Sequence, residues 1–113
     1  MLLTPMAARL LADLEGAHKA LIEHAGATQP LRHGFRAVYE AVSAALGDLD
    51  DARLVAAPAA DAWSMAEVVE HVAEHDRKYR ELERLGLAHY VEHGLEHALQ
   101  LWQLRAGERA EAH

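Results

Sequence analysis

A group of closely spaced histidines is the feature of this chain with the clearest chemical potential. Nine histidines occur among 113 residues, and five of them form three pairs with i, i+4 spacing: His71/His75, His89/His93 and His93/His97. On an α-helix this spacing puts two imidazoles on one face, about 6 Å apart, where both reach one divalent cation. Pairs on two consecutive helices make a three- or four-ligand metal site geometrically possible. A histidine-rich helix surface that holds no metal is the alternative.

The composition limits which ligands and partners the chain can use. Because there is no cysteine, disulfides, thiolate ligands and a cysteine nucleophile are excluded, and any metal must be held by histidine and carboxylate side chains. With 18 acidic against 11 basic residues the net charge is −7, which repels phosphate backbones. We therefore expect no nucleic-acid partner.

The length and the hydrophobicity pattern predict a single small domain over residues 1–113. A core of this size gains usefully from an oligomer interface. The sequence has no apolar run of 18 residues, and no basic segment followed by an apolar one. Neither a membrane span nor a signal peptide is therefore indicated, and we expect a cytoplasmic location.

Apolar residues recur every three or four positions along almost the whole chain, which predicts an all-α fold. The expected helices cover about 4–25, 31–46, 64–85 and 88–105, and a polar tail follows at 106–113. Thr4 and Pro5 mark the start of the first helix, and Gly47 closes the second. The long connection over 48–62 includes a short helical turn around 51–54. Four amphipathic helices of this length predict a four-helix bundle.

The third helix has the best-defined start. Ser64 is the expected N-cap and Glu67 occupies position N3, so that each side chain bonds to the backbone N–H group of the other residue in a capping box. Trp63 is expected to pack on Val68 as a hydrophobic staple.

The third and fourth helices each carry a predicted apolar stripe. The stripe of the third helix, with His75 inside it, consists of Met65, Val68, Val69, Val72, Tyr79 and Leu82. The stripe of the fourth helix consists of Val91, Leu95, Ala98, Leu99 and Trp102. Gly86 separates the two helices; one long continuous helix is the alternative, because a single glycine costs only about 1 kcal/mol.

If Gly86 is a turn, the two helices are antiparallel and His75 lies level with His97. His71 and His75 then share a flank of one helix that meets the flank of the other helix carrying His93 and His97. These four rings can converge on one groove. His75 is interpreted equally well as a core histidine or as a ligand, and His89 as a solvated residue.

The remaining histidines carry weaker signals. His18, His24 and His33 have no partner at i, i+4 and are expected on the surface. Glu15 and His18 form one Glu-x-x-His motif, but a carboxylate-bridged di-iron site needs two. The sequence therefore argues against a ferritin-like protein.

Two motifs resemble those of the DinB-like (YfiT-type) helical bundles. The segment 63–71, Trp-Ser-Met-Ala-Glu-Val-Val-Glu-His, is similar to the opening of the second helix of that family, and 93–101, His-Gly-Leu-Glu-His-Ala-Leu-Gln-Leu, is similar to its late His-x-x-x-His-x-x-Gln helix. The resemblance covers roughly residues 31–104. It implies one divalent ion on His71, His93 and His97, with waters completing the coordination. It also implies a frequent dimer and an activity as a metal-dependent thiol S-transferase or hydrolase.

The chain departs from the family pattern between the two motifs. The family places a whole helix there, whereas only 21 residues separate His71 from His93 in this chain. The first helix of this chain or a helix of a partner chain can replace the missing one. The departure leaves the choice between His71 and His75 open.

The expected chemistry is that of an open metal site. Three neutral imidazoles leave coordination positions free on zinc or nickel, so that a bound water or thiol becomes a nucleophile near neutral pH. The substrate is then a small-molecule thiol or another small molecule. No serine, lysine or tyrosine is placed by the sequence as a second catalytic group. The alternative from another class is a non-catalytic helical dimerisation module of the same fold; a homodimer is expected in both cases.

Overall fold

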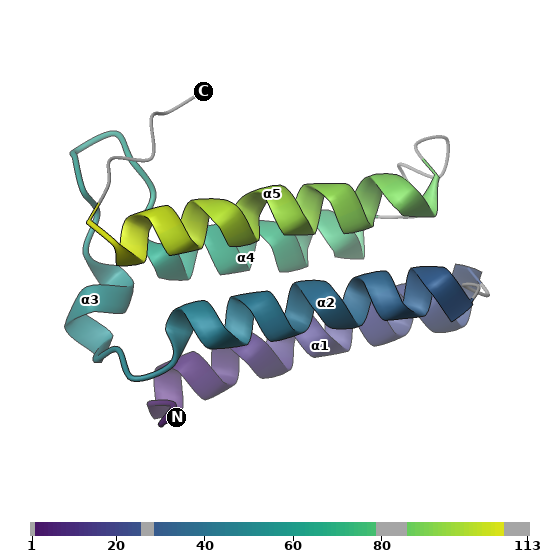
Figure 1. Ribbon diagram of the computed structural model, residues 1–113, viewed down its shortest axis with the longest axis horizontal. Helices are drawn as coiled ribbons and strands as arrows, with labels where there is room; N and C mark the ends of the chain where they lie inside the picture. Colours follow the sequence, from purple (N-terminus) through teal and green to yellow (C-terminus); the bar gives the residue numbers. More distant parts are fainter. Residues whose placement is uncertain (1, 26–28, 79–85, 108–113) are drawn as a thin grey trace.

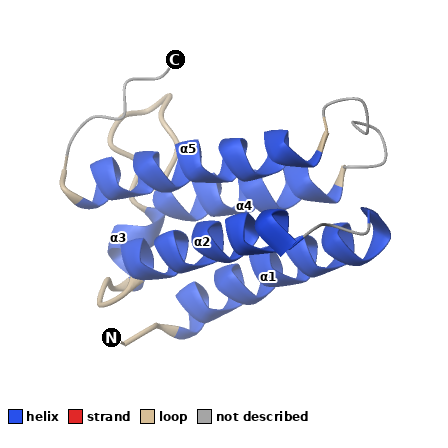
Figure 2. Cartoon of the chain, turned by 45° about the vertical axis from the view of Figure 1, so that its right-hand side comes forward, coloured by secondary structure: helices blue, strands red, loops and turns tan. Residues whose placement is uncertain are grey.

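The computed structural model describes residues 2–25, 29–78 and 86–107, which form helices and loops without a strand (Figure 2). The helices are α1 (Pro5–Ala25), α2 (Gln29–Leu46), the short α3 (Asp51–Val55), α4 (Met65–Arg77) and α5 (Leu87–Arg105). The predicted all-α class and the short turn after residue 50 are confirmed. The expected continuation of the third helix over 79–85, with Tyr79 and Leu82, and the tail 108–113 lie outside the described residues.

The four long helices form a bundle in which α1 lies beside α4 and α2 lies beside α5 (Figure 1). α1 also contacts α2, and α4 contacts α5. α1 and α4 run in one direction, α2 and α5 in the other (Figure 1). The chain passes from α2 to α4 through α3 at one end of the bundle. α4 and α5 are thus two separate antiparallel helices, which rules out the continuous-helix alternative. Gly86 precedes α5 with a φ of 75°, in the left-handed region that favours glycine.

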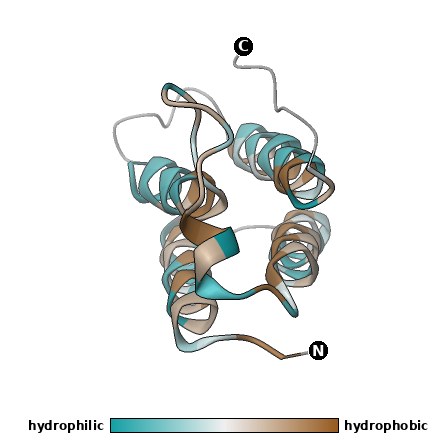
Figure 3. Ribbon diagram, turned by 90° about the vertical axis from the view of Figure 1, so that its left-hand side faces the viewer, coloured by the Kyte–Doolittle hydropathy of each residue, from teal (hydrophilic) through white to brown (hydrophobic). Residues whose placement is uncertain are grey.

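The core lies between the four helices, whose hydrophobic positions turn inward in the end-on view (Figure 3). The fully buried side chains include Leu14 and Leu21 of α1, Val38 of α2, and Val68 and Val72 of α4. Val68 and Val72 belong to the apolar stripe predicted for the third helix. Burial of such stripes is the main source of stability in a small helical bundle.

The end of the bundle at α3 is closed by contacts to backbone groups. Leu54 of α3 is fully buried, and Asp50 caps the helix by accepting a hydrogen bond from the Arg53 N–H group at 2.9 Å. The Arg105 guanidinium, at the end of α5, donates to the carbonyl oxygen of Ala45 near the end of α2 at 3.0 Å. The C-terminal ends of α2 and α5 are therefore joined, which limits sliding of one helix along the other.

The apolar face predicted for the last helix was partly wrong. Leu95, Leu99 and Trp102 are 42%, 61% and 43% exposed. The buried face of α5 consists of Tyr90, Gly94, Ala98 and Leu101. The prediction followed the large apolar residues. It was misleading because α5 packs against α2 through a face that contains the small residues Gly94 and Ala98.

Glycines bring α5 unusually close to α2. A Cβ atom at Gly94 would lie 2.8 Å from Cγ1 of Val38, and a Cβ atom at Gly34 would lie 2.9 Å from Cγ1 of Val91. Carbon atoms in protein cores pack at about 3.5–4.0 Å, so only glycine fits at either position without displacing a valine. These two contacts fix the rotation of α5 about its own axis.

We predict that Gly94→Ala destabilises the protein. The added methyl collides with Val38, which is fully buried and stiff at χ1, and such overpacking costs about 1–3 kcal/mol. This cost outweighs the gain of up to about 1 kcal/mol from replacing glycine inside a helix. Urea denaturation measures the change in the free energy of unfolding.

Gly16→Ala in α1 is the matched control, because nothing lies within 4 Å of a Cβ atom there. It should stabilise the protein by roughly 0.5–1 kcal/mol. Equal stabilisation by both substitutions would contradict the close approach of α5 to α2.

Candidate metal centre

The start of α4 is fixed by the predicted capping box. The Glu67 N–H group donates to Oγ of Ser64 at 3.2 Å, and the Ser64 N–H group donates to Oε1 of Glu67 at 3.0 Å. The box is therefore confirmed. It sets where α4 begins and hence the direction in which His71 projects, two turns further along the helix.

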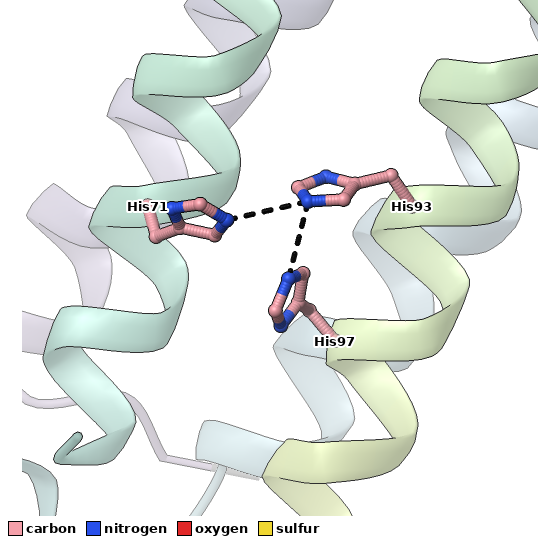
Figure 4. A group of neighbouring side chains, drawn as sticks. All are labelled: His71, His93 and His97. Atoms are coloured by element: carbon pink, nitrogen blue, oxygen red, sulfur yellow. Dashed lines mark hydrogen bonds between the residues drawn. The ribbon is translucent and has the colours of Figure 1, made fainter. Parts of the chain in front are cut away.

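Three histidines from two helices converge at the groove between α4 and α5. His71 comes from α4, His93 and His97 come from α5, and their rings point toward one another (Figure 4). Nε2 of His93 lies 3.2 Å from Nε2 of His71 and 3.2 Å from Nε2 of His97. One ligand atom from each of the three residues falls within a group no wider than 4.8 Å. The structure thus brings together the three residues that the sequence indicated as ligands.

These separations suit a metal ion. With Zn–N bonds of 2.0–2.1 Å, two nitrogen ligands of a tetrahedral ion lie about 3.3 Å apart. Both Nε2 to Nε2 distances at His93 are close to this value. All three residues are half-buried, so one side of the group remains accessible to water or to another ligand.

The hydrogen bond of His97 to Gln100 determines which of its nitrogens is available. Nδ1 of His97 lies 2.8 Å from Oε1 of Gln100. Because the amide oxygen is an acceptor, Nδ1 carries the hydrogen and Nε2 of the neutral ring carries a lone pair. A partner of this kind on the second nitrogen is typical of histidines that bind metals.

The contacts at His93 are poorly explained by hydrogen bonding alone. Its Nε2 atom carries at most one hydrogen, yet it faces Nε2 of both His71 and His97. Its Nδ1 atom is buried and has no hydrogen-bond partner within the described residues. One N–H group of His93 would have to donate to the lone pairs of both His71 and His97. A cation between the rings would instead accept a lone pair from each of the three histidines.

Trp63 covers one side of the group. Its ring centroid lies 4.6 Å from that of His71 and 6.3 Å from that of His97. The residue expected as a staple against Val68 therefore packs on two of the candidate ligands. Its indole restricts the movement of the His71 ring. Apart from the place of Trp63 directly before the capping box, no local sequence pattern indicates this contact.

Burial keeps His71 and His93 in the neutral form that binds metal. It lowers the pKa of His93 to about 3, with additional repulsion from the neighbouring histidines His75, His97 and His71. Burial also lowers the pKa values of His71 and His75. The rings of His71 and His93 are therefore neutral at pH 7, and no proton has to be removed before their lone pairs can bind a cation.

The register of α4 against α5 differs from the predicted one. His97 lies beside His71, with ring centroids 4.8 Å apart, rather than level with His75. Nε2 of His75 instead lies 3.1 Å from Nε2 of His89. Residues of α4 and α5 that face each other are equidistant in sequence from the middle of the segment between the helices, and not from Gly86. His89 contacts His75 in this way instead of facing solvent alone, so its interpretation as a solvated residue was wrong; its i, i+4 spacing to His93 was the available signal.

His18 was also wrongly expected on the surface. Its ring is only 5% exposed, and Nε2 lies 2.8 Å from Oδ2 of Asp76, a fully buried carboxylate on α4. His24 and His33 are exposed as expected. No local spacing indicates the pair of His18 and Asp76, because it forms only when α1 packs against α4.

Comparison with protein-family models, with curated proteins and with solved structures gave no match. The resemblance to DinB-like bundles accordingly depends on the two sequence motifs. In the part of the chain that the structure describes, no helix has the length and apolar character needed to cross a bilayer.

We predict that the metal-free protein loses stability as the pH falls below 6.5. Burial lowers the pKa of His93 from 6.5 to about 3 in the folded chain, so between these values the unfolded chain binds a proton that the folded chain does not. Protonation of the unfolded chain then favours unfolding. The free energy of unfolding therefore falls as the pH drops from 6.5 towards 3, and above pH 6.5 His93 causes no such loss.

Thermal unfolding followed by circular dichroism at pH 7.5, 6.5, 5.5 and 4.5, in the presence of a chelator, measures this dependence. His93→Gln should flatten the decline of Tm with falling pH, whereas His33→Gln, at an exposed position, should leave it unchanged. Parallel pH profiles for His93→Gln and wild type would contradict the lowered pKa of His93.

Proposed function

We propose that this protein is a DinB-like divalent-metal-binding bundle in which His71, His93 and His97 hold one ion. The observation that carries the proposal is the pair of 3.2 Å contacts at Nε2 of His93. They join three imidazole rings from two helices at the separation of ligands on one cation. The hydrogen bond from His97 to Gln100 and the indole of Trp63 against His71 hold two of the three rings in position.

Zinc or nickel is the proposed ion, because a donor set made only of imidazoles suits both. A bound ion with only three protein ligands has open positions, where it acts as a Lewis acid and lowers the pKa of a bound water or thiol. The activity that fits these properties is thiol S-transfer or hydrolysis of a small molecule. Trp63, 42% exposed, offers an apolar surface beside the ligands for part of such a substrate.

A non-catalytic dimerisation module is the second candidate, and one observation favours it. Leu95, Leu99 and Trp102 form an exposed apolar stripe on α5. On the helix this stripe lies about half a turn away from His93, so a partner covering it would leave the histidine groove open. We propose a homodimer through this stripe for either candidate.

The metal proposal predicts that the wild-type protein binds zinc and nickel, and that binding is lost on removal of the ligands. His97→Ala should abolish tight binding, because it removes both a lone pair and the ring held by Gln100. The triple variant His71→Ala/His93→Ala/His97→Ala should bind no ion at this position. Isothermal titration calorimetry on protein made without an affinity tag measures both the affinity and the stoichiometry.

His33→Ala is the appropriate control, because His33 is exposed. His18→Ala is unsuitable, because it leaves the buried Asp76 carboxylate without its partner, a change that is strongly destabilising in itself. Unchanged affinity of the folded triple variant for the first equivalent of zinc would refute the site.

The dimer proposal predicts that wild-type protein at micromolar concentration scatters light with twice the mass of one chain. Leu95→Lys/Leu99→Lys should give monomers, because two charges would be buried in the interface. Lys19→Ala, at an exposed position of α1, should remain dimeric. A wild type that is monomeric under these conditions would contradict the proposal.

A further inference from the structure

The histidine groove extends beyond the three proposed ligands. His75 of α4 and His89 of α5 face each other one helical turn away, with 3.1 Å between their Nε2 atoms. The ring of His75 also lies 4.1 Å from that of His93 and 5.4 Å from that of Tyr90. Five imidazoles therefore form one continuous strip between α4 and α5.

The pair of His75 and His89 repeats the geometry of the first group. Two nitrogens bound to adjacent positions of one ion with M–N bonds of 2.0–2.1 Å lie about 3.0–3.3 Å apart, which includes the observed separation. The two rings come from different helices, so packing of α4 on α5 brings their Nε2 atoms together before any ion binds. Both residues are half-buried, which leaves room for water to complete the coordination.

We propose that His75 and His89 bind a second divalent cation of the copper, nickel and zinc class. Imidazole is a favoured ligand of all three. The site lies next to the one on His71, His93 and His97 but uses different side chains, so each can exist without the other.

The second ion binds more weakly than the first. It has two protein ligands instead of three, and it lies about one helical turn from the first ion. The corresponding rings on each helix are 6.3 Å apart for His71 and His75 and 5.9 Å apart for His89 and His93. Two dications at such a separation repel each other, although the net charge of −7 offsets part of the repulsion. We expect a dissociation constant at least tenfold higher for the second ion.

Zinc titration of tag-free protein, with bound zinc measured after equilibrium dialysis, tests the proposal. Wild type should bind two equivalents at saturation. His75→Gln/His89→Gln should bind one equivalent with the affinity of the first site retained. The matched control His24→Gln/His33→Gln also removes two histidines, both exposed, and should bind two equivalents. Circular dichroism establishes that each variant is folded, and His89→Gln alone gives the same test without any change in α4.

The reciprocal variant, His71→Gln/His93→Gln/His97→Gln, should retain one equivalent of zinc. Its affinity should exceed that of the second equivalent in wild type, because the repulsion from the first ion is gone. A wild type that saturates at one equivalent which His75→Gln/His89→Gln still binds, or a His75→Gln/His89→Gln variant that binds two, would overturn the second site. If wild type instead saturates at one equivalent that is lost in His75→Gln/His89→Gln and kept in the reciprocal variant, the three-histidine site fails and the second site stands.

Discussion

The close approach of α5 to α2 is the constraint on which the geometry of the groove depends. Gly94 leaves no room for a Cβ atom beside Val38, and Gly34 leaves none beside Val91. Because successive residues of an α-helix are about 100° apart, His93 and His97 lie about 100° and 60° from Gly94, both on the same side. Fixing Gly94 against α2 therefore turns both histidines towards α4. A larger residue at position 94 would rotate or displace the helix and with it two of the three candidate ligands.

The histidine groove combines two properties that work against each other in the absence of an ion. Burial lowers the pKa values of His71 and His93 and keeps these two rings neutral, and packing brings the Nε2 atoms of His71, His93 and His97 together. Neutral rings cannot all satisfy one another by hydrogen bonding, since His93 has one Nε2 atom for two neighbours. Groups of buried polar atoms that lack a full set of partners are costly. A cation held between the rings would satisfy the lone pairs that hydrogen bonding among the three histidines leaves over.

Much of this arrangement could be predicted from the sequence because its signals are local. The capping box of Ser64 and Glu67 and the i, i+4 histidine pairs depend only on helix geometry, and they predicted the start of α4 and the convergence of histidines from two helices. The resemblance to DinB-like bundles singled out His71, His93 and His97 among them. The register that pairs His75 with His89 depends on the length of the whole connecting segment. The exposure of Leu99 and the burial of His18 arise from contacts between helices distant in sequence, which apolar periodicity does not encode.

A crystal structure of the zinc-loaded protein, with anomalous difference maps collected on both sides of the zinc absorption edge, tests the three-histidine site most directly. We expect a zinc peak about 2.0–2.1 Å from Nε2 of each of His71, His93 and His97, with the Gln100 contact to His97 retained. A folded protein whose zinc peaks all lie away from these three nitrogens, or that shows no peak, would contradict it.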